Sequence, residues 1–293
     1  MHVGVIGGGS IGLLVAAQIG IDHKVTVYVR RQEQKEEINR EGLFFLPAHT
    51  RSNVSALLVS EIKQEEMMFV CVKQYHLRHL YPYLQEIRCP IIFLQNGMGH
   101  VGYILRYQNK QTILVGTCEH GAIKVNDRCV KQTGEGKINI ASVTGDKLSL
   151  TKVIDSFHRQ SFPIVIKEDW YKMLGEKLII NAVVNPLTAL FQVKNGEILK
   201  NPYLTTLAKA LCKETCDVLG LVDKDQWDNV VRVIRITKEN ESSMKLDIMN
   251  NRKSEIEGIC GYLLTHTKVD TPNLQFMYEA IRALEHSKGV VGK

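Results

Sequence analysis

Three polar side chains recur at intervals of four residues in an otherwise apolar stretch. Lys177, Asn181 and Asn185 stand in the segment KLIINAVVNPLT, residues 177–188. An α-helix turns by about 100° per residue, so positions four apart drift by only about 40° and share one face. The other faces are apolar, as in a buried helix, where an ammonium and two amides need polar partners. We therefore expect this face to contact a polar ligand; bulk water or carboxylates of the chain itself are the alternatives.

A glycine pattern near the N-terminus is typical of phosphate binding. It follows an expected strand at residues 2–6, precedes apolar residues at helical spacing over 11–19, and consists of Gly7, Gly8, Gly9, Ser10, Ile11 and Gly12. In a G-x-G-x-x-G loop the first glycine permits a tight turn, the second lets the backbone approach a pyrophosphate, and the third lets the helix pack closely. The context predicts a dinucleotide-binding loop, with a ligand-free turn as the alternative.

The second expected strand, residues 24–29, ends at Arg30 and Arg31. NAD sites usually carry Asp or Glu here, whereas a guanidinium can hold a 2′-phosphate by charge-assisted hydrogen bonds. The pair favours NADP; two solvated arginines are the alternative, and Glu33 keeps NAD open. A nicotinamide cofactor implies hydride transfer. Lys177 could then stabilise charge developing on a carbonyl oxygen and donate the proton.

Two further side chains follow expected strands. Lys73 comes after the strand at residues 67–72, and Asn96 after the strand at residues 91–94. Ligands of open parallel sheets bind outside the carboxyl ends of the strands, so both side chains could face the cofactor. A solvated lysine and an ordinary Asn-Gly turn are equally consistent with the spacing.

The C-terminal half adds polar candidates in loops. Asn195 lies in a loop after the lysine-bearing helix, and Ser243 lies in the segment SSMKLD, residues 242–247. A hydroxyl and free N–H groups at the start of a helix can hold a carboxylate. In the same segment, Asp247 is a candidate for a helix cap. Two interpretations of Glu255 stay open: an exposed helix residue, or a carboxylate that orients Lys177 or the cofactor ribose.

The elements that must position these residues change along the chain. Strands are also expected at residues 54–59 and 113–116, and antiparallel edge strands at 134–140 and 162–166. Alternating strands and helices imply a parallel sheet covered on both faces. Beyond residue 168 helical patterns dominate, broken by Pro186, Pro202, Gly220 and Pro272. We predict an α/β domain over residues 1–168 and an all-α domain over residues 169–293.

Composition limits the classes of function. The 293 residues are 44% hydrophobic and 23% charged, which excludes collagen-like and disordered chains. Residues 1–165 hold 19 basic against 14 acidic side chains, an excess that suits a phosphorylated small ligand. With no basic run of five and no interleaved aromatics, we expect no nucleic-acid partner. With no apolar run of bilayer length and no signal sequence, we expect no membrane partner and a cytoplasmic protein.

The cysteines predict neither a disulfide framework nor a metal site. Seven of them are scattered through both halves without a Cys-x-x-Cys pair. Cys212 and Cys216 are one helical turn apart, but a structural zinc site needs more thiolates at short spacing. We expect reduced structural thiols and no metal.

Together, these residues resemble the ketopantoate reductase family (2-dehydropantoate 2-reductase) over nearly the whole chain. The strongest match is residues 177–190, which end in NPLTAL. Supporting matches are the glycine loop, Arg30, Val72-Lys73, residues 95–99, Asn195-Gly196-Glu197, Ser242-Ser243-Met244, Asp247, Glu255-Ile256 and residues 269–273.

The resemblance implies NADPH-dependent reduction of ketopantoate to pantoate, on the path to pantothenate and coenzyme A. It makes Lys177 the proton donor and a substrate contact, with the other substrate contacts at Asn181, Asn185, Asn195 and Ser243. On the cofactor side, besides the glycine loop, it places Arg30, Lys73, Asn96, Ala122 and Glu255. The implied fold is a Rossmann-type N-terminal domain and a helical C-terminal domain with the active site between them. The oligomeric state is open, and a homodimer is one candidate.

Three positions depart from the family pattern. Leu246 stands where some members carry Gln, Glu119 where small hydroxyl residues are common, and Cys260 where Asn is frequent. A carboxylate near the nicotinamide side would repel a 2-oxo acid. Two alternatives therefore stay open: a reductase of another 2-oxo acid or an imine, and a non-catalytic redox sensor that binds NADP.

Overall fold

The structure is a computed structural model, and it describes the chain except residues 49, 53, 108–110, 146–153, 156 and 291–293. The chain divides into two compact units. The first comprises Met1–Gln95 and His100–Met173, and the second Asn96–Gly99 and Leu174–Lys293. The boundary predicted after residue 168 precedes helix α6 (Trp170–Phe191), whereas the observed division falls inside that helix.

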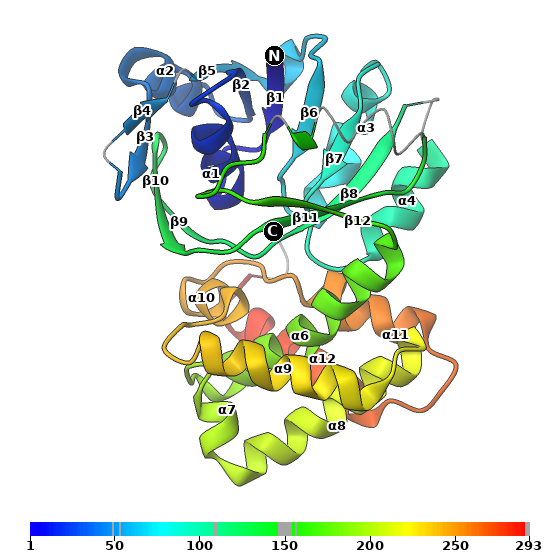
Figure 1. Cartoon of the computed structure of the whole chain (residues 1–293). Helices are drawn as coiled ribbons and strands as arrows, with labels where there is room; N and C mark the ends of the chain where they lie inside the picture. Colours follow the sequence, from blue (N-terminus) through cyan, green and yellow to red (C-terminus); the bar gives the residue numbers. More distant parts are fainter. Residues whose placement is uncertain (49, 53, 108–110, 146–153, 156, 291–293) are drawn as a thin grey trace. The chain divides into compact units, whose positions relative to one another are not determined.

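An eight-stranded sheet forms the centre of the first unit (Figure 1). Its order is β12-β11-β8-β7-β6-β1-β2-β5. Six strands run parallel: β1 (His2–Ile6), β2 (Lys24–Val29), β5 (Val54–Leu58), β6 (Met67–Val70), β7 (Ile91–Phe93) and β8 (Ile113–Cys118). The α-helices of this unit include α1 (Ser10–Ile19), α2 (Gln32–Glu41), α3 (Leu77–Leu84) and α4 (Gly99–Tyr107); short 3-10 helices span Val59–Glu61 and Gln74–His76. The predicted α/β class is confirmed.

The edge strands differ in detail from the prediction. β11 (Ile138–Ser142) is antiparallel to β8, and β12 (Ile164–Lys167) is parallel to β11, so both run antiparallel to the six parallel strands, as expected. The strand expected at residues 134–140 starts later, because Gly134 is the last residue of another strand, β10.

A second, four-stranded sheet was not predicted. It has the order β4-β3-β10-β9 and comprises β3 (Leu43–Leu46), β4 (Thr50–Ser52), β9 (Gly121–Asn126) and β10 (Cys129–Gly134). Helix α1 contacts β1 and β2 of the large sheet and β3, β9 and β10 of the small one. Residues 12–19 of α1 are all buried as a result, which explains why this helix is almost entirely apolar, with Gln18 as the exception among them. The hairpin β9–β10 thereby lies beside the helix that follows the glycine loop.

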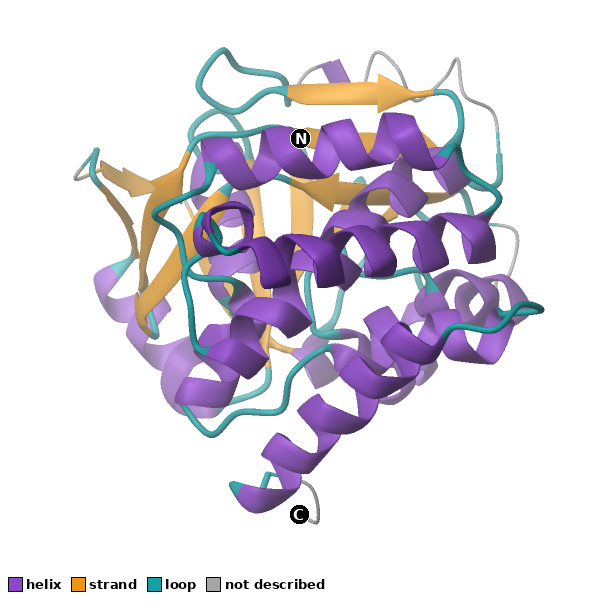
Figure 2. Ribbon diagram, turned by 90° about the horizontal axis from the view of Figure 1, so that it is seen from below, coloured by secondary structure: helices purple, strands orange, loops and turns teal. Residues whose placement is uncertain are grey.

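The second unit is helical, as predicted; helices are purple in Figure 2. Besides α6 it contains α7 (Glu197–Lys200), α8 (Pro202–Leu219), α9 (Asp223–Ile236), α10 (Ser243–Met249), a π-helical turn (Glu257–Gly261), α11 (Tyr262–His266) and α12 (Pro272–Ser287). Pro202 and Pro272 occupy first helical turns, and Gly220 ends α8 with φ 66°. Pro186 was expected to break the helical pattern, but α6 continues through it. We attribute the continuity to the buried neighbours Val183 and Leu187, whose packing can offset one lost backbone hydrogen bond.

Helix α6 is also long and apolar enough to cross a membrane, with a mean hydropathy of 1.2 over its most apolar window. However, 61% of that window is buried inside the protein. This burial is typical of the core helix of a globular fold.

Glu214 on α8 fixes the start of the C-terminal helix. Its carboxylate accepts hydrogen bonds from the backbone N–H groups of Asn273 (3.0 Å) and Leu274 (2.8 Å), and from Asn273 Nδ2 (2.6 Å). These are N–H groups that a helix leaves without an internal partner. The resemblance noted at residues 269–273 therefore coincides with a helix start that a distant carboxylate caps.

His100 on α4 is a buried imidazole that predicts acid sensitivity. It is 1% exposed, and neither ring nitrogen has a hydrogen-bond partner in the described part of the chain. Burial lowers the pKa of His100 from 6.5 to about 3. Below pH 6.5 the unfolded chain therefore binds a proton that the folded chain refuses, so the free energy of unfolding falls as the pH falls from 6.5 towards 3.

Near pH 5 this loss amounts to about 2 kcal/mol, at about 1.4 kcal/mol per pH unit below the unfolded pKa. We expect His100→Met to remove that part of the pH dependence. Urea unfolding at neutral pH and near pH 5, followed by circular dichroism, measures it. Equal losses in the wild type and the variant would contradict the prediction.

Candidate active site

Gly7, Gly9 and Gly12, the three glycines of the G-x-G-x-x-G pattern, have the geometry that their predicted roles require. Gly7 has φ +115°, a conformation that side chains rarely adopt. A Cβ built on Gly12 would lie 1.8 Å from the carbonyl oxygen of Gly7, so only glycine lets α1 pack this closely. A Cβ on Gly9 would meet no atom within 4 Å. The loop therefore has open space at the position where a pyrophosphate is expected to approach the backbone.

The N-terminus of α1 is available to an anion. Gly9 is its N-cap and supplies no side-chain hydrogen bond, and the first turn contains no acidic residue. The first N–H groups of a helix lack internal partners and lie at the positive end of its dipole. The Ser10 hydroxyl accepts a hydrogen bond from the backbone N–H of Lys124 on β9 (3.1 Å). A phosphate fits the chemistry of this helix end.

The two arginines after β2 differ in their surroundings. Arg30 is exposed and makes no hydrogen bond or ion pair with the described residues. Arg31, the N-cap of α2, forms an ion pair with Asp127, which lies in the turn between β9 and β10. Of the pair, Arg30 is thus the freer guanidinium. Glu33, which kept NAD open, is exposed in the first turn of α2.

Lys73 and Ala122 belong to the same unit as the glycine loop. Lys73 is half-buried and precedes a short 3-10 helix, and the adjacent Val72 is close enough to Gly7 to obstruct any side chain there. Ala122 lies on β9 and packs against the core around α1. Both lie on segments that border the loop.

The three residues of the predicted polar face all lie on α6, in the second unit. Lys177 and Asn181 are half-buried, and Asn185 is 9% exposed. The amide groups of Asn181 and Asn185 make no hydrogen bond with any residue that the structure describes. Two amides on one face of a mostly buried helix are therefore left for a ligand or water.

Ser242 and Ser243 have different roles. Ser242 is the N-cap of α10: its hydroxyl accepts from Lys245 N (3.1 Å) and from Thr188 Oγ1 (2.7 Å). It ties this loop to α6. Ser243, the first residue of α10, is exposed, and its hydroxyl makes no hydrogen bond within the described chain. Asp247 is not a helix cap, since it lies inside α10 and accepts a hydrogen bond from Arg252 Nε (3.1 Å).

Glu255 joins Asn96 in the second unit. Asn96 Nδ2 donates to Glu255 Oε2 at 2.8 Å, and Glu255 is 8% exposed. The preceding Ser254 donates its N–H to Glu285 Oε1 on α12 (2.8 Å) and accepts at its hydroxyl from Ile256 N (3.2 Å). Glu255 is thus a buried, oriented carboxylate. Glu255 is therefore not an exposed helix residue, and its role towards Lys177 or the cofactor ribose stays a prediction.

Asn195 is less available than predicted. It is 7% exposed, and its Nδ2 donates to Thr237 Oγ1 at 3.0 Å. Its Oδ1 is buried and has no partner among the described residues. The Nδ2 donor of Asn195 is therefore already engaged, whereas its Oδ1 could accept a hydrogen bond.

The three departures from the family pattern have ordinary surroundings. Glu119 is exposed and accepts a hydrogen bond from Asn139 Nδ2 (2.8 Å). Leu246 is half-buried in α10. Cys260 is fully buried, and burial raises the pKa of its thiol to about 12, so it stays a neutral core side chain.

All seven cysteines are free thiols. The Sγ atoms of Cys212 and Cys216 and a carboxylate oxygen of Asp223 lie within 4.8 Å of one another. Sequence reasoning considered the two thiols and missed the carboxylate. Three such groups can arise from core packing at a helix end, and the expected absence of a metal stays a prediction.

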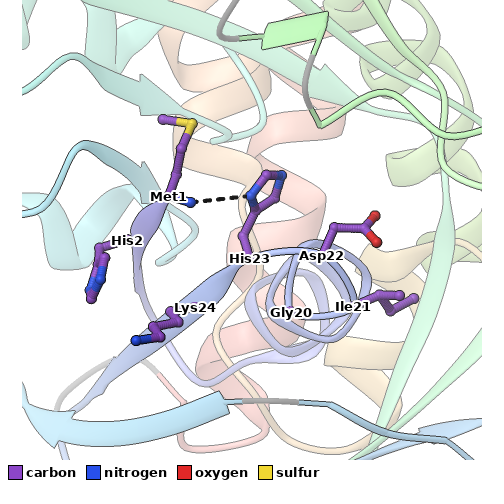
Figure 3. A pocket seen from close by; sticks show the side chains of 7 residues that line it. All are labelled: Met1, His2, Gly20, Ile21, Asp22, His23 and Lys24. Carbon is purple, nitrogen blue, oxygen red and sulfur yellow. Dashed lines mark hydrogen bonds between the residues drawn. The ribbon is translucent and has the colours of Figure 1, made fainter.

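A surface pocket exists elsewhere in the first unit (Figure 3). It is lined by the first two residues and residues 20–24, and the Met1 amine lies 3.5 Å from His23 Nδ1. These residues are at the amino ends of β1 and β2, whereas the glycine loop follows the carboxyl end of β1. The pocket contains none of the predicted site residues.

Comparisons with known proteins agree with this arrangement. The family model described as ketopantoate reductase PanE/ApbA matches residues 3–145, and the model of its C-terminal part matches residues 169–285. A 2-dehydropantoate 2-reductase of Bacillus subtilis is 37% identical over 99% of this chain and 100% of its own length.

Solved structures of ketopantoate reductases are also similar to this chain. The crystal structure of a probable 2-dehydropantoate 2-reductase from Bacillus subtilis has a TM-score of 0.89 at 38% identity, over 97% of this chain and 100% of its own. A dimeric ketopantoate reductase from Staphylococcus aureus has a TM-score of 0.80 at 19% identity, over 99% of this chain and 100% of its own, which shows the shared fold.

Proposed function

Because the chain belongs to the ketopantoate reductase family, we propose that it reduces ketopantoate (2-dehydropantoate) to pantoate with NADPH. The reaction serves the synthesis of pantothenate and coenzyme A. The enzyme is then an NADP-dependent oxidoreductase whose substrate is a small 2-oxo acid.

The observation that carries the substrate assignment is the polar face of α6. Asn181 and Asn185 present amides that no described residue satisfies, and Lys177 lies one turn before them. A 2-oxo acid offers a carboxylate and a carbonyl, which need donors of this kind. We assign Asn181, Asn185 and Ser243 to substrate binding. Asn195 contributes to it through the loop in which it lies.

Lys177 is the proposed catalytic acid. Reduction of the substrate carbonyl would place negative charge on its oxygen. The Lys177 ammonium stabilises that charge and donates the proton. Glu255 and Asn96, joined by their hydrogen bond, are proposed to shape the site beside the cofactor.

The glycine loop fits the proposed cofactor. Open space at Gly9 and the uncapped start of α1 suit a pyrophosphate, and the exposed Arg30 suits a 2′-phosphate. We assign cofactor binding to the glycine loop, Arg30, Lys73, Asn96, Ala122 and Glu255. A nicotinamide dinucleotide supplies the hydride; the residues named here bind and orient it.

We further propose a cytoplasmic enzyme that acts without nucleic-acid or membrane partners and forms a homodimer. Seven free cysteines, five of them buried, suit a reducing compartment. A relative of the same fold is dimeric. Light scattering of the purified protein at several concentrations tests the dimer.

The substrate is tested by following NADPH oxidation with ketopantoate, pyruvate, 2-oxoisovalerate and a cyclic imine. We expect the highest kcat/KM with ketopantoate. Equal or faster turnover of another 2-oxo acid or the imine would show that the same scaffold serves a different substrate. No turnover with any of them would favour the non-catalytic sensor.

A further inference from the structure

Asp127 forms ion pairs with two cations beside the glycine loop. It lies in the turn of the β9–β10 hairpin, where its carboxylate accepts from Lys124 Nζ at 2.8 Å and pairs with Arg31. The side chains of Asp127, Lys124 and Arg31 are 19%, 27% and 47% exposed. The group is thus partly shielded from water, but it remains accessible to a ligand.

Hydrogen bonds attach this hairpin to the glycine loop. Lys124 Nζ donates to the carbonyl oxygen of Gly8 (3.0 Å), and Lys124 N donates to Ser10 Oγ (3.1 Å). Gln34 on α2 donates from Nε2 to both Gly8 O and Asp127 O, at 2.9 Å each. The hairpin turn, the start of α2 and the glycine loop therefore converge on Gly8.

The charges at this point favour an anion with more negative charge than one carboxylate. Partial burial raises the pKa of Asp127, but hydrogen bonds from Lys124 and Arg31 outweigh it, so the pKa lies below the ordinary value. Asp127 is then ionised at neutral pH. With Arg31 and Lys124 it leaves one net positive charge, to which the exposed Arg30 adds a second.

We propose that Lys124 and Arg31 bind the 2′-phosphate of the cofactor, and that Asp127 limits this binding by holding both cations until the phosphate displaces it. The inference rests on the proposed use of NADPH, and it adds Arg31, Lys124 and Asp127 to Arg30 as residues that determine the preference for it. The second strand of a dinucleotide fold ends where the adenosine ribose binds, and Arg31 follows β2 at that point. Lys124 reaches the same place from the unpredicted sheet.

The test compares direct binding of NADPH and NADH, which differ only in the 2′-phosphate, by titration calorimetry without substrate. Lys124→Gln keeps a donor for Gly8 O but removes the charge. We expect its Kd for NADPH to rise about 10-fold, as for the loss of one charge-assisted bond, and its Kd for NADH to change by less than about twofold. Asp127→Asn removes the competitor, and its Kd for NADPH should fall roughly three- to fivefold.

Asp22→Asn is the matched control. Asp22 pairs with Arg159 at 2.9 Å in the same unit, near the amino ends of the strands, and its removal should leave both Kd values unchanged. Thermal melting of each variant identifies any that fail to fold; if Lys124→Gln is one of them, Asp127→Asn still decides the proposal by the direction of its effect.

Equal weakening of NADPH and NADH by Lys124→Gln would overturn the proposal, because Lys124 would then serve a part common to both cofactors. Weaker NADPH binding by Asp127→Asn would also overturn it, since Asp127 would then only position the cations. If the wild type binds NADPH and NADH equally, the choice of NADPH in the proposed function fails as well. A wild type that prefers NADPH, with variants that do not alter the preference, would refute only the roles of Lys124 and Asp127.

Discussion

Lys177→Ala is expected to lower kcat by a factor on the order of 10² or more, the range for loss of a positioned proton donor. The ammonium both stabilises the developing oxyanion and supplies the proton, and no methyl group can do either. The Kd for NADPH should stay within about twofold of the wild type, since we assign Lys177 to the substrate, and the glycine loop belongs to the other compact unit. Stopped-flow turnover and cofactor titration measure the two quantities separately.

Lys172→Ala is the matched control, because Lys172 is an exposed lysine on the same helix and is not part of the polar face. It should retain wild-type kcat. If Lys177→Ala keeps its turnover, the proton comes from another group or from water and the proposed mechanism is wrong. A protein that shows no turnover even as wild type, yet binds NADPH, would support the sensor.

Local pattern predicted the parts of the site that depend on neighbouring residues. The glycine loop is framed by β1 and α1, and its identity follows from spacing over a dozen residues. Lys177, Asn181 and Asn185 share a face because helix geometry fixes that relation before any tertiary contact forms. Strand β2 was predicted to its final residue, since six consecutive residues alternate under a strong β propensity.

Long-range pairing explains most of what the sequence could not show. β10 pairs with β3 across more than eighty residues, and β9, which pairs with β10, contacts the glycine loop through Lys124. No sequence feature near Lys124 or Asp127 indicates that these residues lie beside the glycine loop. The difference between Arg30 and Arg31 depends on Asp127 as well, so adjacent residues of one type could not be distinguished from spacing.

The sequence also could not show which single polar groups are available to a ligand. Asn195 and Ser242 are both polar loop residues, but partners from other elements, Thr237 and Thr188, occupy them. Glu255 was undecided because its surroundings depend on its hydrogen bond from Asn96 and on the bond that ties the adjacent Ser254 to Glu285 on α12. Whether a polar side chain is free depends on tertiary contacts, which the local pattern does not contain.

Two alanine substitutions in the glycine loop should differ in their effects on thermal stability and on NADPH binding. At Gly12 a Cβ would lie 1.8 Å from the carbonyl oxygen of Gly7, so the loop and α1 must move apart. Overpacking of this severity costs about 3 kcal/mol. We expect Gly12→Ala to lower the melting temperature of its unit by roughly 6 to 12 °C and to weaken NADPH binding as a consequence.

At Gly9 a Cβ meets nothing, and φ is −89°, so alanine fits the cofactor-free protein without strain. Its methyl group would instead occupy the space that a pyrophosphate needs. Gly9→Ala should therefore melt within about 2 °C of the wild type while its Kd for NADPH rises on the order of 10-fold or more. Calorimetric melting and cofactor titration of both variants separate the two causes. Unchanged NADPH binding in Gly9→Ala would mean that the open space beside this glycine is not the phosphate site, and the assignment of the loop would have to be withdrawn.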